Sequence, residues 1–180
     1  MRRAFTLIEL LIVVGIIAIL ALIALPNFLE AQVRAKVVRA RADLRTHATG
    51  IEIYRTDTNA YPPEQNDDSM PVNLTTPIQY LSSLPTDSFN RPSANFRVTI
   101  YKYHNVRAHV EGDELEWPDT DLRRYGDWRM FSFGPRQEYM PYIPYDPTNG
   151  TISDGNILRT QVSSDGGIPF TYWDPGNPTI

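Results

Sequence analysis

A single carboxylate, Glu9, lies inside a long apolar segment near the N-terminus. Sixteen residues without a polar side chain run from Leu10 to Leu25, and the segment extends back to Phe5 with only Thr6 and Glu9 as polar positions. A charge there costs about 2.5–3.5 kcal/mol at the centre of a bilayer and less near its edge, and such residues are usually functional. The residues alone leave two interpretations open: Glu9 reaches the lipid headgroups at little cost, or it has a functional role.

Oxygen-bearing side chains gather in two places in the second half of the chain. Calcium prefers carboxylate and amide oxygens, although neither set has the spacing of an EF-hand loop. The second set, which lies near turns, predicts a structural calcium site, with solvated turn carboxylates as the alternative. The first set is Asp113, Glu114, Glu116, Asp119 and Asp121, and the second is Asp146, Asn149, Asp154 and Asn156.

Other catalytic or metal-binding patterns are absent from the sequence. His47, His104 and His109 show no zinc-ligand spacing with a carboxylate partner, so we expect them on the surface or in the core. The lack of cysteine excludes disulfides and cysteine-ligated metals. No G-x-S-x-G, P-loop or G-x-G-x-x-G motif occurs. We therefore predict no catalytic residues and no enzyme activity.

The element that carries Glu9 is a predicted membrane-spanning helix. As a helix, positions 5–25 span ~31 Å, which matches a hydrocarbon core of ~30 Å. Arg2 and Arg3 precede it, so the N-terminus should be cytoplasmic and the remaining chain extracytoplasmic. A cleaved signal peptide has a shorter apolar region that ends in small residues, and a core helix of a soluble protein would be shorter and less apolar. A plain membrane anchor stays open at this point.

The same helix should continue as an amphipathic stalk over 27–56. Apolar residues recur at steps of three and four, and basic residues fill many other positions, so the apolar stripe should pack on the head. Pro26 should bend or loosen the helix, because it lacks an N–H and crowds the carbonyl of Leu22, and Gly15 is a second weak point. A coiled coil is the alternative, but fewer than four clean heptads occur. The stripe is Val37, Val38, Leu44, Ala48, Ile51 and Tyr54.

The head, residues 57–180, is predicted to contain short elements. Fourteen of the fifteen prolines follow Asn59. Thr76-Pro77 predicts the start of a short helix that runs to Leu84. Strands follow, so the fold class is α+β, with the long N-terminal helix packed on a small antiparallel β-sheet. The predicted strands are Phe96–Tyr103, Ala108–Trp117 and Trp128–Phe133, with a hairpin over Gly150–Arg159 that turns at Asp154-Gly155.

Charge divides the chain into a basic stalk and an acidic head. From Glu30 to Thr56 there are six Arg/Lys and three Asp/Glu, whereas from Asp57 to Ile180 there are nine and seventeen. A nucleic-acid-binding surface has to be basic to neutralise phosphates, so no nucleic acid is expected at the head. In an assembly, the basic stalk could meet the acidic head of a neighbour.

The segment Ala4-Phe5-Thr6-Leu7-Ile8-Glu9-Leu10-Leu11 resembles the processing and methylation motif of type IV pilins and type II secretion pseudopilins. The resemblance implies that a prepilin peptidase cuts between Ala4 and Phe5 and methylates the new amine of Phe5. It also implies that Glu9 pairs with this amine on a neighbouring subunit and that Pro26 serves in assembly. Ala4 departs from the usual glycine before the cut.

This resemblance also implies a function and a set of partners. The chain would be a structural subunit of a pseudopilus in the bacterial inner membrane and periplasm, supporting protein export. Its partners would be like subunits, minor pseudopilins, the prepilin peptidase, the inner-membrane secretion platform and membrane lipid. Major pseudopilins commonly hold a calcium ion in a C-terminal loop. The alternatives are a surface type IV pilin for adhesion, motility or DNA uptake, and a membrane-tethered binding or enzymatic domain. The implied parts are a leader over 1–4, a polymerisation helix over 5–26, the stalk over 27–56 and the head over 57–180.

Overall fold

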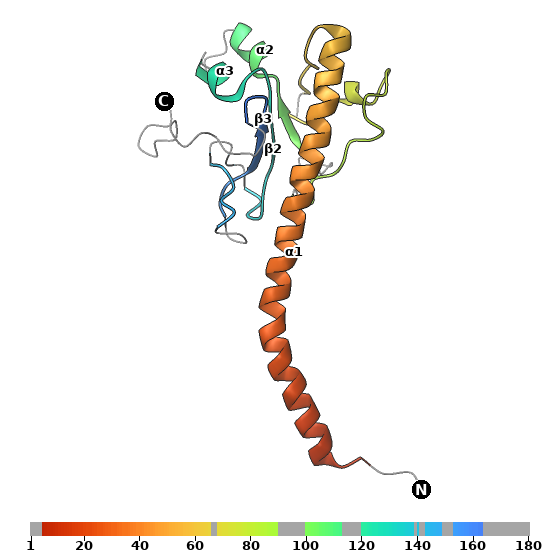
Figure 1. Ribbon diagram of the computed structural model, residues 1–180, viewed down its shortest axis with the longest axis vertical. Coiled ribbons are helices and arrows are strands. Elements are labelled where there is room, and N and C mark those ends of the chain that lie inside the picture. The colour runs from red at the N-terminus through yellow and green to blue at the C-terminus, as the bar shows by residue number, and fades with distance from the viewer. Residues whose placement is uncertain are drawn as a thin grey trace.

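One long helix carries a small mixed head at its C-terminal end (Figure 1). The computed structural model describes residues 5–65, 68–89, 100–112, 120–138, 140, 143–148 and 153–163. The N-terminal half of α1 extends away from the head, and it is long and apolar enough to cross a membrane. The elements are α1 (Leu7–Thr58), a 3-10 helix η1 (Val72–Leu74), β1 (Lys102–His104), α2 (Val106–Glu111), α3 (Thr120–Tyr125), β2 (Arg129–Ser132) and β3 (Ile157–Thr160).

Local signals define both ends of α1. Thr6 is the N-cap, and its side chain accepts a hydrogen bond from the N–H of Glu9, while Glu9 accepts one from the N–H of Thr6. At the other end, Asn59 adopts the left-handed conformation (φ 58°) and donates its N–H to the carbonyl of Arg55. These caps satisfy backbone groups that a helix end would otherwise leave unpaired. The helix ends two residues beyond the predicted stalk boundary at 56.

The strands form one antiparallel sheet in the order β1-β2-β3. Tyr103 lies opposite Met130 across the first pair, and Met130 lies opposite Arg159 across the second. Strand β2 confirms the predicted strand over Trp128–Phe133. Strand β1 confirms the C-terminal part of the strand over Phe96–Tyr103, whose residues 96–99 lie outside the described part of the chain.

Three local predictions for the head are wrong. Residues Ala108–Glu111 of the predicted strand over Ala108–Trp117 belong to α2, because Asn105 caps the N–H of Ala108 and starts a helix. The predicted helix from Thr76 does not form, because the carbonyl of Leu74 accepts the N–H groups of both Tyr80 and Leu81 and folds the chain back.

The third wrong prediction is the hairpin turn at Asp154-Gly155, and residues 150–152 of the predicted hairpin lie outside the described part of the chain. The N–H of Asn156 donates to the carbonyl of Ile143, and its carbonyl accepts from Tyr145, so its backbone partners lie in another segment. Strand β3 pairs with β2 instead.

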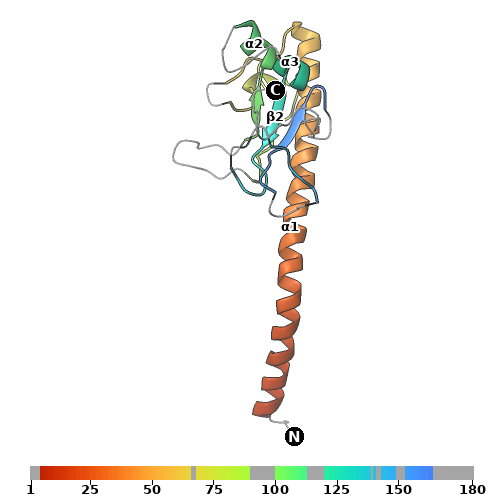
Figure 2. The same cartoon turned by 90° about the vertical axis from the view of Figure 1, so that its left-hand side faces the viewer.

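Both faces of the sheet are covered, as the alternating side chains of β2 and β3 show. Met130 and Ile157 point into the core beneath α1, whereas Phe131 and Leu158 pack with Val106 of α2 and with Tyr125 at the end of α3. The two views agree that β2 lies beside the C-terminal half of α1 (Figures 1 and 2). This layering confirms the α+β prediction and explains why β2 is buried throughout.

The stalk stripe packs on the head as predicted, with one exception. Val37, Leu44, Ala48 and Ile51 are buried in the main core, and Tyr54 is partly buried against it. Val38 is exposed, because it lies on the outer face of the helix. The buried side of the stalk also includes Ala40, His47 and Gly50.

Candidate functional site

The N-terminus of α1 contains the residues predicted for processing and assembly. Phe5 is exposed just before the helix, and Ala4 lies outside the described residues. Glu9 Oε2 accepts hydrogen bonds from the Thr6 N–H at 2.9 Å and the Thr6 hydroxyl at 2.7 Å. Within this single chain, Glu9 therefore caps its own helix. Its carboxylate is exposed and accessible to a positive charge from outside the chain.

The first half of α1 presents apolar side chains on every side. All residues from Phe5 to Leu29 are exposed except Ala21, which is half-buried. Leu7 is 85% exposed and Leu22 is 74% exposed. A continuous apolar surface of this length is far beyond what a monomeric soluble protein exposes, and its shape suits lipid or other apolar helices. This apolar surface must therefore be covered by lipid, by the same helix of other copies of the chain, or first by one and then by the other.

The helix continues through Pro26 and curves gently over this half (Figure 1). Pro26 cannot donate to the carbonyl of Leu22, and the side chain of Asn27 donates to the next carbonyl, that of Ile23, at 3.2 Å. A bend or loosening at Pro26 itself stays a prediction. Local unravelling between Gly15 and Pro26 stays a prediction.

Three basic residues of the stalk have partners within the same chain. Arg34 pairs with Glu30 at 2.5 Å, and Arg39 lies 3.7 Å from Asp43, each one helical turn apart. The guanidinium of Arg41 stacks over the ring of Tyr145, 5.7 Å from its centroid. Exposed pairs of this kind are worth about 0–1 kcal/mol, so they could be exchanged for contacts with another subunit. Contact between this stalk and a neighbouring head stays a prediction.

Two stalk carboxylates bind the head directly. The hydroxyl of Tyr101 donates to Asp43 at 2.8 Å, and the indole N–H of Trp128 donates to Glu52 at 2.8 Å. Burial, together with the hydrogen bond to Asp43, raises the pKa of Tyr101 well above its usual value, so the phenol stays a donor. The stalk and head are thus fixed to one another by polar as well as apolar contacts.

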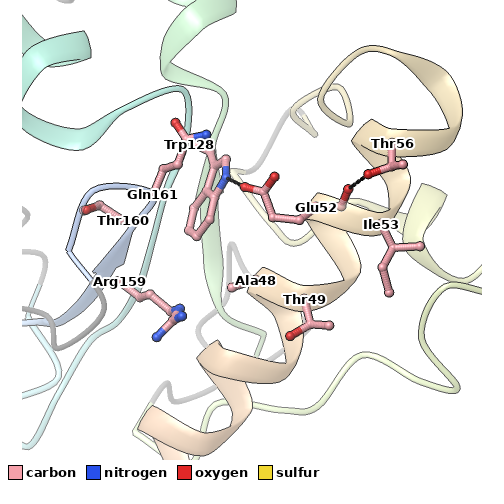
Figure 3. A pocket seen from close by; sticks show the side chains of 9 residues that line it. All are labelled: Ala48, Thr49, Glu52, Ile53, Thr56, Trp128, Arg159, Thr160 and Gln161. Atoms are coloured by element: carbon pink, nitrogen blue, oxygen red, sulfur yellow. Dashed lines mark hydrogen bonds between the residues drawn. The ribbon is translucent and has the colours of Figure 1, made fainter.

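An open groove of about 440 Å³ lies beside the Trp128–Glu52 contact (Figure 3). One wall of the groove comes from α1, where the hydroxyl of Thr56 donates to the carbonyl of Glu52. The other wall comes from β3 and the residues around it. The lining residues are Ala48, Thr49, Glu52, Ile53, Thr56, Trp128, Arg159, Thr160 and Gln161.

Glu64, His104 and His109 meet in the head, although their spacing in the sequence does not group them. His104 Nδ1 lies 2.9 Å from Glu64 Oε1, and His109 Nε2 lies 2.7 Å from Glu64 Oε2. His104 is buried and His109 is partly buried, and both contact a carboxylate that their sequence spacing did not indicate. Burial tends to raise the pKa of Glu64, but its hydrogen bonds and charge interactions with both histidines outweigh burial and hold the pKa at about 2.

Asp87, in the Leu84-Pro85-Thr86-Asp87 stretch, is a buried carboxylate with a structural role. It accepts hydrogen bonds from the Phe89 N–H at 2.9 Å, the Ser132 hydroxyl at 2.8 Å and the Phe133 N–H at 3.2 Å. Burial raises the pKa of Asp87 despite these bonds. Asp87 thereby ties its loop to the end of β2.

Asn156, one of the residues predicted to bind calcium, already has protein partners. Its amide nitrogen donates to the carbonyls of Phe133 and Glu138, each at 2.9 Å. Its side-chain oxygen accepts the N–H of Met140 at 2.7 Å. Asn156 therefore joins the loop after β2 to the start of β3.

The other predicted calcium ligands lie nearby but do not form a complete set. Asp154 pairs with Arg136, and Asp146 accepts the N–H of Thr148 at 2.8 Å. Asn149 lies outside the described residues, as do Asp113, Glu114, Glu116 and Asp119 of the first acidic set. The backbone N–H of Asp146 donates to the Ser153 hydroxyl, so two parts of the predicted site are adjacent. The calcium site stays a prediction.

Comparison with known proteins finds one family motif and several relatives. Residues 1–25 match the prokaryotic N-terminal methylation motif. The chain is 33% identical over 100 residues to the type II secretion system core protein G of Pseudomonas aeruginosa, covering 51% of this chain and 70% of that protein. It is 25% identical over 155 residues to the core protein G of Dickeya chrysanthemi, covering 86% of this chain and 90% of that protein.

A second group of relatives consists of pilins. The chain is 45% identical over 60 residues to the type IV major pilin protein PilA of Myxococcus xanthus, covering 33% of this chain. The match spans only 27% of the length of that pilin. No solved structure is significantly similar to the chain.

Proposed function

Because the chain belongs to the family of type II secretion system core protein G, we propose that it is a pseudopilin that polymerises through α1 into a pseudopilus supporting protein export. The observation that carries this proposal is the fully exposed apolar half of α1, joined to a head that has its own core. Before assembly, this helix would lie in the inner membrane. On assembly, it would leave the lipid and pack against the same helix of other subunits.

The proposed assembly pairs two charges. After cleavage behind Ala4, the amine of Phe5 would lie next to the carboxylate of Glu9 on a neighbouring subunit. An unpaired buried charge commonly costs several kcal/mol, so this pair would favour one axial register over others. Since Glu9 is exposed in the single chain, it can bind an external amine without any change in the head.

Orientation and partners follow from the same proposal. Arg2 and Arg3 would keep the N-terminus cytoplasmic, where the prepilin peptidase acts, and the head would be periplasmic. Like subunits, minor pseudopilins and the inner-membrane platform would be its protein partners. The head would have no catalytic role, and no nucleic acid would bind it.

A surface type IV pilin is the second candidate, because about a third of the chain resembles the pilins of Myxococcus xanthus and Thermus thermophilus. The longer match to core protein G, which extends into the head, favours the pseudopilin. A membrane-tethered binding or enzymatic domain is the alternative of another class.

Deletion of the gene in its host, with complementation, separates these candidates. We expect exoproteins to accumulate in the periplasm of the deletion strain and to be exported again when the wild-type chain is restored. Loss of surface filaments and twitching with normal export would identify a pilin instead. Mass spectrometry of the native protein should show a methylated Phe5 at the N-terminus, and an intact Met1 would contradict the proposal. Ala4→Gly is the control, and it should be cleaved at least as efficiently.

A further inference from the structure

Glu64 meets His104 and His109, which lie 40 and 45 positions further along the sequence. Glu64 follows the C-terminal end of α1, His104 is the last residue of β1, and His109 is in α2. One ligand atom from each residue lies within 4.8 Å of the other two. Two imidazole nitrogens and one carboxylate are therefore close enough to contact a single ion.

The surrounding contacts hold these side chains in place. The N–H of Asn105 donates to Glu64 Oε2 at 3.1 Å, which fixes the carboxylate. The ring of His104 stacks on Phe131 with a centroid distance of 5.8 Å and an interplanar angle of 18°. Asn105 also donates from its side chain to the carbonyl of Pro62 at 3.3 Å, so the loop before Glu64 is tied to the start of α2. Support of this kind is typical of residues that orient metal ligands.

Two of the three residues are partly accessible to solvent. The side chain of His104 is 5% exposed, whereas those of Glu64 and His109 are 16% and 20% exposed. The cluster is thus shielded on the side of the sheet and open on the side of α2. An ion could enter past His109 and keep one position for water.

We propose that Glu64, His104 and His109 form a binding site for a divalent transition metal, with Zn²⁺ as the ion that this ligand set fits. Two histidines and one glutamate with a fourth, open position are a common Zn²⁺ arrangement. The two nitrogen ligands disfavour Ca²⁺, which takes oxygen. The site is separate from the residues predicted for calcium, and it does not depend on the proposed function.

Binding of an ion requires a local rearrangement of the three side chains. Tetrahedral Zn²⁺ with ligands at ~2.0–2.1 Å places neighbouring ligand atoms ~3.3 Å apart. The nitrogen–oxygen distances here are 2.9 Å to Oε1 and 2.7 Å to Oε2 of Glu64, and the three ligand atoms lie within 4.8 Å of one another. One oxygen of Glu64 would bind the ion, and the rings would shift towards that ion as it replaces their hydrogen-bonding protons. The bound ion would cross-link the end of α1, the sheet and α2.

Zinc titration of the purified full-length chain in detergent, after chelator treatment, tests the site. We expect one equivalent of Zn²⁺ to bind and to raise the melting temperature of the head. In His109→Gln and Glu64→Gln the affinity should fall by more than about tenfold, because a ligand is lost. Glu111→Gln is the control, since Glu111 is an exposed carboxylate on the same helix as His109.

A second readout identifies the ligands. Co²⁺ in place of Zn²⁺ should give the visible absorption of a low-coordinate site with nitrogen ligands in the wild type and in Glu111→Gln, but not in His109→Gln. His109 is only partly buried, so His109→Gln should keep the far-ultraviolet circular dichroism of the wild type. The proposal is overturned by failure of the wild type to bind zinc, or by equal binding in wild type and His109→Gln.

Discussion

Glu9 has two sets of potential partners, one local and one in another subunit. In the single chain it completes a capping box with Thr6. In the proposed filament it would instead pair with the amine of Phe5 on a neighbour. Substitutions that separate these two roles therefore test the assembly mechanism at a single residue.

Replacement of Glu9 should block assembly without preventing membrane insertion. Glu9→Leu removes both the cap and the charge, whereas Glu9→Gln keeps a capping-box residue and removes only the charge. We expect both variants to reduce the assembled fraction by at least ~tenfold, because the neighbour's amine would be left unpaired. The assembled and membrane-bound fractions can be measured by shearing and fractionation. Normal assembly of Glu9→Gln would show that the charge is dispensable.

His47 should make the head less stable in acid. It is fully buried against Tyr101, whose hydroxyl donates to Asp43, and neither ring nitrogen has a hydrogen-bond partner among the described residues. Burial lowers the pKa of His47 to about 4. The unfolded chain takes up a proton near pH 6.5, so the stability that the neutral ring provides is present above that pH and is lost as the pH falls towards 4.

The measurement is denaturant unfolding of the full chain in detergent between pH 7.5 and 4. The loss attributable to His47 should approach about 3 kcal/mol over this range. Since other groups also titrate, the quantity to follow is the free energy of unfolding of the wild type minus that of His47→Leu, which should decrease as the pH falls. A difference that does not change with pH would contradict this account of His47.

At the scale of elements, the two halves of α1 differ in their exposure and in what they contact. The first half is exposed and apolar, and the second is amphipathic and buries Leu44 and Ile51 under the sheet. Length and periodicity were sufficient to predict α1, because both signals extend over many turns. The short elements were harder to predict, because each depends on a few local contacts. Helix α2 depends on one capping residue, Asn105, and the carbonyl of Leu74 folds back the segment after Thr76.

The loop around Asp87 should depend on its carboxylate. Asp87→Ala leaves up to three buried donors without their partner, so we expect a loss of about 3 kcal/mol in the free energy of unfolding. Glu111→Ala, which removes an exposed carboxylate paired only at the surface with Arg107, should change it by less than about 1 kcal/mol. Chemical denaturation of the full chain in detergent compares the two. Equal stability of Asp87→Ala and wild type would mean that water replaces the lost acceptor.

For the whole molecule, the sequence predicted the assembly end better than the head. Phe5, Glu9 and Pro26 are recognisable because they lie in one contiguous segment with a specific motif. Glu64 and His109 could not be paired from the sequence, since they are 45 positions apart and meet only through the packing of α2 on the sheet. Val38 shows the same limit on a smaller scale, because periodicity did not reveal which edge of the stripe the head would cover.

In the whole molecule, the apolar N-terminal half of α1 is exposed, and the head is folded against the C-terminal half. Because the sequence contains no cysteine, introduced cysteines report contacts between subunits without background. Leu11 and Leu22 are suitable positions, since they are 71% and 74% exposed.

Cross-linking of Leu11→Cys/Leu22→Cys subunits in host cells with a flexible bismaleimide tests most directly whether α1 is the polymerisation surface. We predict a ladder of dimers, trimers and higher species, and loss of the ladder when Glu9→Leu is added while the protein stays in the membrane. A processed, membrane-inserted protein that gives only monomer in both backgrounds would contradict assembly through α1.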